Sequence, residues 1–255
     1  MKVLAVVGSA YPLFGGAQRT SHAFLRRLRT ERGWDVLLAT GHPRRVRLAP
    51  GGVPIETYRD VEELKAIARR ERPDVLVGAL EGIPDALRVA ARFALPSIVS
   101  LHSFEYCPPT PDEVAAWGVS AERRYPDADE TAWVLAAATR IVANSRYLRD
   151  RMRARHGIEA EIVFPELAPD DVLIDRTRRR GGYLTGICGH HYKGADVFLA
   201  LAAAFPRERF LLVGDVDPAL APAFAARPNV RVLGRTTTRR FLAMSKVVLV
   251  PSRWP

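Results

Sequence analysis

A glycine-rich segment that ends in a lysine is the part of the sequence best suited to bind a phosphate. This segment spans residues 186–194 and contains His190 and Lys193. Small residues let the backbone approach a ligand, and backbone N–H groups at a helix N-terminus can bind a diphosphate together with one ammonium group. A metal site formed by Cys188, His190 and His191 is the alternative, although adjacent histidines rarely point at one ion and no carboxylate lies nearby in the sequence.

A histidine and a pair of glycines are further candidates at the ends of predicted strands. His102 directly follows the apolar run 97–101 and could hydrogen-bond a ligand or carry a proton, because ligands bind beyond the carboxyl ends of strands in open α/β sheets. The other interpretation is a histidine that caps a helix or is hydrogen-bonded in the core.

Gly15 and Gly16 precede the first predicted helix. The backbone there could contact a phosphate or sugar, or it could form an ordinary turn between a strand and a helix. Their spacing is not that of a dinucleotide-binding G-x-G-x-x-G motif.

Short apolar runs alternate with longer amphipathic stretches, which is typical of parallel strands connected by crossover helices. The runs predict strands at 3–7, 36–39, 75–77, 97–101, 140–143, 161–164, 183–187, 210–213, 230–233 and 247–250. The amphipathic stretches predict helices at 17–29, 61–70, 84–94, 131–138, 145–156, 195–205, 218–226 and 238–245. A polar, Pro-rich stretch, 107–129, interrupts the alternation and is either part of a binding surface or a surface excursion.

The alternation is also interrupted at 165–180, a segment rich in Pro, Asp and Arg that we interpret as a linker. We therefore expect an α/β protein with two Rossmann-like parallel-sheet domains facing a cleft. The predicted domains are residues 1–165 and 181–255, with a linker at 166–180 and a second domain that is incomplete in this chain. Gly214 and Gly234 end strands of the second domain, as glycines often do in α/β folds.

Composition narrows the functional classes. The chain has 255 residues, is 48% hydrophobic and carries a formal net charge of +10. Nucleic-acid binding is disfavoured because the arginines are scattered and no aromatic residues are interleaved with them. The two cysteines are far apart and match no disulfide or zinc pattern. No apolar run is long enough for a signal peptide or membrane span, so we expect a cytoplasmic protein with at most peripheral membrane contact.

Eight segments, taken in order, resemble the retaining GT-B glycosyltransferases of family 4. In the first domain they are Gly15-Gly16-Ala17-Gln18, Arg72-Pro73-Asp74-Val75, Leu101-His102-Ser103-Phe104 and the segment 142–148. In the second domain they are the segments 193–196, 210–215, 229–234 and 250–255. The resemblance covers nearly the whole chain.

The resemblance implies transfer of a sugar from a nucleotide-sugar donor to an acceptor hydroxyl, with retained configuration and without a metal or other cofactor. It makes the first domain the acceptor side and the second the donor-binding domain. Lys193 would stabilise the diphosphate, His102 would hydrogen-bond the donor sugar, and the backbone near Gly234 would meet the nucleobase. The implied catalytic residues are His102 and Lys193, and the implied donor-binding residues are Gly15, Gly16, Gly186, His190, Lys193, Gly214, Gly234, Ser252 and Arg253.

Three departures from the family pattern favour keeping a second hypothesis. Ile187 stands where the family has an arginine after the glycine matched by Gly186, and Gln18 replaces a glutamate. The family's two glutamates spaced by seven residues, and its final helix, would follow Pro255. The alternative is therefore a non-catalytic relative or partner subunit that binds nucleotide-sugars without the donor carboxylates. The oligomeric state, donor and acceptor are left open.

Overall fold

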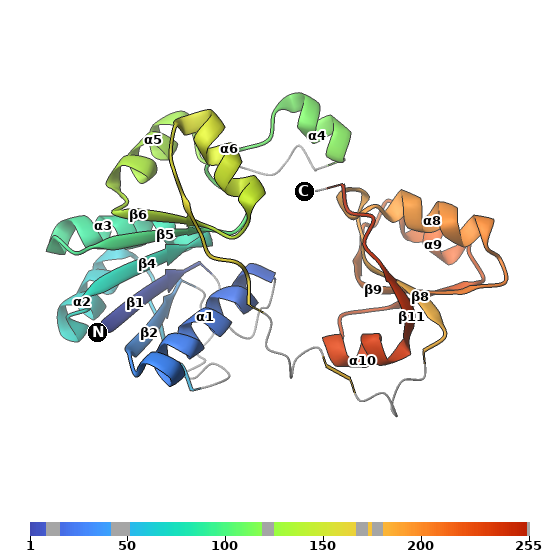
Figure 1. Ribbon diagram of the computed structural model, residues 1–255, viewed down its shortest axis with the longest axis horizontal. Coiled ribbons are helices and arrows are strands. Elements are labelled where there is room, and N and C mark those ends of the chain that lie inside the picture. Colours follow the sequence, from blue (N-terminus) through green and yellow to red (C-terminus); the bar gives the residue numbers. More distant parts are fainter. Residues whose placement is uncertain (9–15, 42–51, 119–124, 167–172, 175–180, 254–255) are drawn as a thin grey trace. The chain divides into compact units, whose positions relative to one another are not determined.

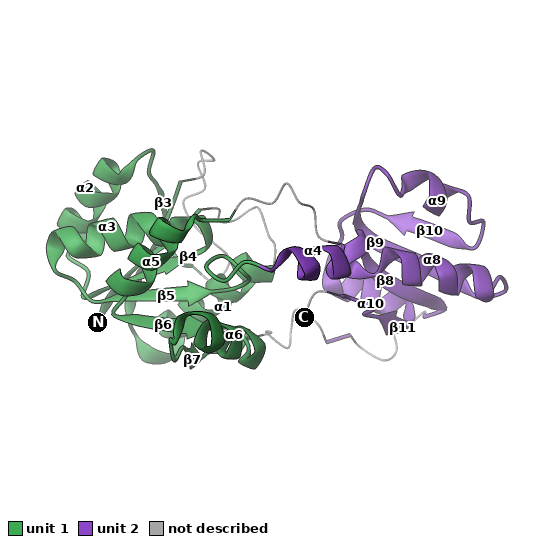
Figure 2. Ribbon diagram, turned by 90° about the horizontal axis from the view of Figure 1, so that it is seen from above, with its two compact units in different colours: residues 1–108, 124–166 green, residues 109–123, 167–255 purple. Residues whose placement is uncertain are grey.

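The computed structural model describes residues 1–8, 16–41, 52–118, 125–166, 173–174 and 181–253. They form two compact units, which are considered separately. Unit 1 comprises residues 1–108 and 124–166, and unit 2 comprises residues 109–123 and 167–255 (Figure 2). Gly15 and most of the predicted linker at 166–180 lie outside the described residues.

Unit 1 is built on a seven-stranded parallel sheet with the order β3-β2-β1-β4-β5-β6-β7 (Figure 1). Its strands are β1 (Lys2–Val7), β2 (Asp35–Thr40), β3 (Ile55–Thr57), β4 (Val75–Ala79), β5 (Ser97–Leu101), β6 (Arg140–Ala143) and β7 (Glu161–Ile162). Its helices are α1 (Gly16–Arg32), α2 (Val61–Glu71), η1 (Leu80–Gly82), α3 (Ile83–Phe93), α5 (Ala128–Ala137) and α6 (Arg146–His156).

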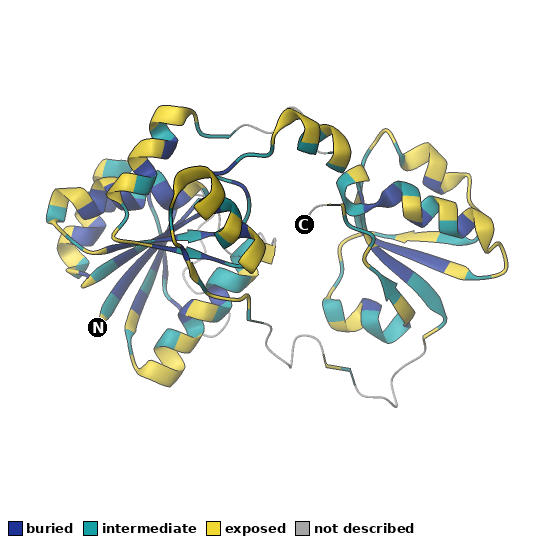
Figure 3. Ribbon diagram, turned by 45° about the horizontal axis from the view of Figure 1, so that its top comes forward, coloured by how far each residue is buried: buried dark blue, intermediate teal, exposed yellow. Residues whose placement is uncertain are grey.

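The two faces of this sheet pack against different helices because successive side chains of a strand point to opposite faces. Ala5 and Val7 of β1 pack with Leu25 of α1. Leu4 and Val6 belong to a second core cluster, which contains residues of α2 and α3. The buried residues are concentrated in the strands (Figure 3), so the sheet is a rigid support for the loops at its carboxyl edge.

Unit 2 is built on a four-stranded parallel sheet with the order β10-β9-β8-β11. Its elements are α4 (Pro111–Trp117), β8 (Tyr183–Gly189), η3 (His191–Lys193), α8 (Ala195–Ala204), β9 (Arg209–Val216), α9 (Ala221–Ala225), β10 (Val230–Leu233), α10 (Thr238–Met244) and β11 (Ser245–Leu249). Phe198 of α8 and Phe224 of α9 pack on one face of the sheet, and Phe241 of α10 packs on the other. In the described parts of the chain, no helix is both long and apolar enough to traverse a bilayer.

Three differences from the predicted elements concern β3 and α4, which the sequence did not predict, and α9, which is shorter than predicted. The edge strand β3 has only three residues. Helix α4 lies in the Pro-rich stretch 107–129, where Thr110 and Glu113 form a capping box and Pro111 occupies the first turn without loss of a hydrogen bond. Helix α9 covers less than the predicted 218–226, because the Asp217 side chain accepts from the backbone of Ala219 in a turn that delays the helix.

Gly82 lets η1 pack directly on the central strand β1. A Cβ atom at Gly82 would lie 2.6 Å from the carbonyl oxygen of Val6. We predict that Gly82→Ala lowers the free energy of unfolding by about 1–3 kcal/mol, as for other overpacked cores. The matched change Gly16→Ala, at a site with nothing within 4 Å, should stay within about 0.5 kcal/mol. Urea unfolding of both variants measures this difference, and equal stabilities would contradict it.

Candidate functional site

The loop that carries Lys193 is a compact turn between β8 and α8. Strand β8 has a register shift between Ile187 and Gly189, and Cys188 within it has a φ of +62°. The backbone N–H groups of Lys193 and Ala195 both donate to the carbonyl of His190, at 2.9 and 3.2 Å. The turn therefore fixes Lys193 just before the first residue of α8, where the helix dipole adds positive potential.

The loop after β11 lies directly on this turn. The backbone N–H of Arg253 and the hydroxyl of Ser252 donate to the carbonyl of Tyr192, at 3.1 and 3.3 Å. Gly194 has a φ of +76°, and a Cβ atom there would overlap the carbonyl of Pro251. The structure thus brings Ser252 and Arg253 together with the loop that carries Lys193.

The side chains around this turn are held by ionic and aromatic contacts. The guanidinium of Arg253 donates to the Asp196 carboxylate. The imidazole of His190 stacks on Tyr192 with ring centroids 5.5 Å apart, and the Lys193 ammonium lies 5.5 Å from the centroid of the same ring. Asp196 balances the charge of Arg253, so the Lys193 ammonium is the group at this turn that suits an anionic ligand.

The ends of β9 and β10 add a second charged pair to this edge. Arg235 donates through Nε to both carboxylate oxygens of Asp215, at 2.9 and 3.1 Å. This hydrogen bonding holds the pKa of Asp215 below its usual value. Gly214 adopts a φ of +102° beside Cys188, and Gly234 has nothing within 4 Å of its Cβ position. A ligand could therefore approach the backbone at Gly234 closely.

Gly186 lies within β8 rather than in the loop. A Cβ atom there would lie 2.6 Å from the Phe198 ring of α8, so the glycine lets α8 pack on the sheet. Its predicted contact with a donor stays a prediction.

The sequence left a metal site at Cys188, His190 and His191 as an alternative. These three residues are among those that the structure describes. Within the described residues, no group of three or more His, Cys, Asp or Glu side chains is placed to hold a metal ion.

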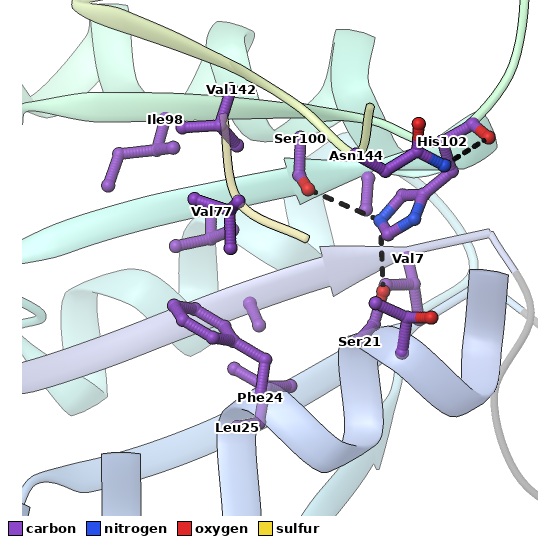
Figure 4. A pocket seen from close by; sticks show the side chains of 14 residues that line it. Val7, Ser21, Phe24, Leu25, Val77, Ile98, Ser100, His102, Val142 and Asn144 are labelled. Carbon is purple, nitrogen blue, oxygen red and sulfur yellow. Dashed lines mark hydrogen bonds between the residues drawn. The ribbon is translucent and has the colours of Figure 1, made fainter. Parts of the chain in front are cut away.

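In unit 1, His102 follows β5 at the carboxyl edge of the sheet. Its Nε2 atom lies 3.2 Å from the hydroxyl of Ser100 and 3.4 Å from that of Ser21 (Figure 4). The amide of Asn144, at the end of β6, donates to the His102 carbonyl at 2.8 Å. Burial lowers the pKa of His102. A half-buried, neutral imidazole at this edge can exchange hydrogen bonds with hydroxyl groups.

The imidazole lies at one end of a cavity of about 200 Å³ between α1 and the sheet (Figure 4). The rest of the lining is mostly apolar and includes Phe24, Val77, Ile98 and Val142. Gly16, the first residue of α1, has its Cβ direction open. The backbone of Gly16 accepts from the hydroxyl of Thr20 at 3.0 Å, so the glycine is part of the first helical turn.

The sequence does not identify several residues that lie beside the candidate residues. Ser100 is the one that sequence spacing can identify, because it precedes His102 by two residues and shares its face of the strand. Ser21 lies far away in the sequence and carries no signal of its own. Glu81 was also missed: its side chain lies over Gly8 at the carboxyl end of β1, after Leu80 with a φ of +54°.

Burial of two histidines makes the stability of the protein depend on pH. Burial lowers the pKa of His22 and of His102 from the usual value of 6.5. The unfolded chain therefore binds more protons than the folded one below pH 6.5, and the free energy of unfolding should fall as the pH falls through that region. Urea unfolding between pH 5 and pH 8 measures the slope, which should be smaller in His22→Gln/His102→Gln. An equal slope in that variant would contradict the prediction.

Comparison with known proteins identifies the family. Residues 14–164 match the model of Glycosyltransferase Family 4. The chain belongs to this family. No match was found among curated proteins.

Solved structures show which fold the family 4 chain adopts. A glycosyltransferase from Rickettsia africae is 12% identical, with a TM-score of 0.68 over 98% of this chain and 73% of that chain. AviGT4, a glycosyltransferase involved in avilamycin A biosynthesis, is 20% identical, with a TM-score of 0.59 over 98% and 68%. The UDP-GlcNAc 2-epimerase of Neisseria meningitidis bound to UDP-GlcNAc is 10% identical, with a TM-score of 0.59 over 97% and 77%. The α/β units of this chain thus have the GT-B fold, as the sequence predicted.

Proposed function

We propose that this family 4 member transfers a glycosyl group from a nucleotide-sugar donor to an acceptor hydroxyl, with retention of the anomeric configuration. The observation that carries the proposal is the contact between the Lys193 turn and the loop after β11: the Lys193 ammonium lies over the Tyr192 ring, and the backbone N–H of Arg253 donates to the Tyr192 carbonyl. A similar structure holds a UDP-sugar, which supports a donor of this class. We expect the protein to work in the reducing cytoplasm, where Cys107 and Cys188 remain free thiols.

In the proposed reaction, the bond between the anomeric carbon and the diphosphate oxygen breaks, and the electron pair stays on the diphosphate. The acceptor oxygen forms the new bond to that carbon, and its proton ends on the nucleoside diphosphate. Lys193 and the N-terminus of α8 stabilise the charge that develops on the leaving group. His102 hydrogen-bonds the sugar as positive charge develops at the anomeric carbon.

The charge of this site suggests that transfer proceeds without a metal ion. Lys193 and the N-terminus of α8 supply positive potential that a divalent ion would otherwise supply at a diphosphate. We predict that EDTA leaves the transfer rate unchanged, within about twofold. A loss of activity in EDTA that Mg²⁺ or Mn²⁺ restores would contradict this part of the proposal.

Product analysis tests the proposed reaction. The full chain is incubated with α-linked UDP- and GDP-sugars and a panel of sugar, lipid and aromatic alcohols, and mass spectrometry detects the product. NMR coupling constants of the new linkage should report an α-configured product. A β-linked product would contradict retention, and an epimerised free donor would indicate epimerase chemistry. Tight nucleotide binding without turnover of any donor would favour the non-catalytic alternative.

A further inference from the structure

The loop that begins at His102 is held in place by a neighbouring helix. Three of its residues, Phe104, Tyr106 and Cys107, are no more than 2% exposed. The backbone N–H of Cys107 donates to the carbonyl of Phe104 at 3.4 Å, which closes a turn. Burial raises the pKa of the Cys107 thiol to about 11, so at neutral pH it is a packing residue rather than a nucleophile.

Arg151 of α6 contacts this loop at three of its residues. Its Nε donates to the carbonyl of Cys107 at 3.0 Å, and one terminal nitrogen donates to the carbonyl of Pro108 at 2.9 Å. The guanidinium also lies over the Phe104 ring, 5.2 Å from its centroid. A planar guanidinium can make these contacts at once, whereas a lysine ammonium has no such fork.

Other residues of the same helix support this arrangement. Arg155 also donates to the carbonyl of Pro108. The Nε2 atom of His156 donates to the carbonyl of Tyr106 at 2.9 Å. The start of the loop is held by Asn144, which donates to the carbonyl of His102. Backbone carbonyls at both ends of the loop are therefore bound by side chains from the β6–α6 region.

We propose that Arg151 is a positioning residue that fixes the imidazole of His102 for glycosyl transfer by holding the loop of residues 102–108. This inference rests on the proposed function. Without Arg151, the buried carbonyl of Cys107 loses this donor and the Phe104 ring loses one of the groups packed on it. A loop with an unsatisfied buried carbonyl rearranges to reach water, and a displacement of about 1 Å is enough to slow catalysis.

The experiment compares Arg151→Ala with Arg149→Ala, a matched change on the same helix. Arg149 hydrogen-bonds Asp150, its neighbour in the sequence. In Arg151→Ala we expect kcat to fall by about 10- to 100-fold while the Kd for the nucleotide that the protein binds, UDP or GDP, stays within about twofold. Arg149→Ala should leave both values unchanged. Guanidinium ions well below the denaturing range should partly restore kcat in Arg151→Ala only.

A second readout does not depend on transferase activity. NMR titration of the free protein follows the His102 imidazole, whose signal is assigned by its loss in His102→Gln. In Arg151→Ala the pKa of His102 should move up toward 6.5 because the looser loop admits water. If Arg151→Ala does not fold, Arg151→Lys should show the same change to a smaller extent.

The two readouts separate this inference from the proposed function. An unchanged His102 titration, or a loss of activity that only follows the loss of folded protein, would overturn the role of Arg151. A wild-type protein that transfers no sugar while its His102 titration still responds to Arg151→Ala would overturn the proposed function and retain the positioning of the imidazole.

Discussion

Replacing Lys193 with alanine should slow glycosyl transfer by about two to three orders of magnitude. Lys193 directly precedes Gly194, the N-cap of α8, and belongs to the turn on which the Arg253 loop packs. There it can stabilise the negative charge that develops on the departing diphosphate, and removal of one such group typically costs about 10²- to 10³-fold in kcat. Steady-state rates with a saturating donor measure the loss.

Lys246→Ala is the matched control for this prediction. Lys246 belongs to the same unit, and its ammonium lies 3.4 Å from the Glu208 carboxylate. Its replacement removes the same charge from the protein without touching the Lys193 turn, so the transfer rate should be unchanged. Equal effects of the two substitutions would mean that net charge, rather than the Lys193 turn, governs activity.

Replacing His102 with alanine should lower kcat by about 10²-fold and leave unchanged the affinity for the nucleotide that the protein binds, UDP or GDP. A hydrogen bond that strengthens in the transition state lowers kcat when it is lost, whereas a free nucleotide lacks the sugar that His102 is proposed to contact. Rates at saturating donor and calorimetric titration with that nucleotide measure the two quantities separately.

His156→Gln is a comparison of the same residue type in the same unit, at the C-terminal end of α6. Its side chain donates to the carbonyl of Tyr106, in the loop that carries His102, and a glutamine amide can also donate to that carbonyl. We therefore expect a much smaller effect on kcat than from His102→Ala. A fall in nucleotide affinity in His102→Ala that accounts for the whole loss would contradict a role in the transfer step.

The sequence predicted the two parallel-sheet units because buried parallel strands are apolar on both faces, as the runs 3–7 and 210–213 are. It did not predict β3, because three residues are too few for a periodic signal. It also did not predict α4, because the helix depends on a capping box between Thr110 and Glu113 inside a Pro-rich stretch.

The sequence predicts which residues of the candidate site lie at the ends of strands. It does not predict which side chains contact them. Lys193 and Arg253 each follow a predicted strand of the second domain, and the carboxyl ends of parallel strands lie at one edge of a sheet. That their strands, β8 and β11, are neighbours is known only from the structure. The pairing of Arg253 with Asp196 joins residues 57 positions apart, and that of His102 with Ser21 joins residues 81 positions apart. Such contacts depend on how helices pack, and the spacing of motifs does not specify them.

The sequence shows that residue 186 is a glycine, but it does not show which neighbour requires a glycine there. A glycine near a predicted phosphate loop suggests backbone contact with a ligand, yet the structure places the Phe198 ring where its side chain would be. Only the packing of α8 on β8 distinguishes these two reasons for a glycine.

Calorimetric titration of the 255-residue chain with UDP and GDP tests the central claim most directly. The claim is that the Lys193 turn and the Arg253 loop form a diphosphate site in unit 2. We predict that one of the two nucleotides binds to the wild-type chain and that Lys193→Ala weakens its binding by at least about tenfold. Binding of neither nucleotide, or equal binding by Lys193→Ala, would contradict the account.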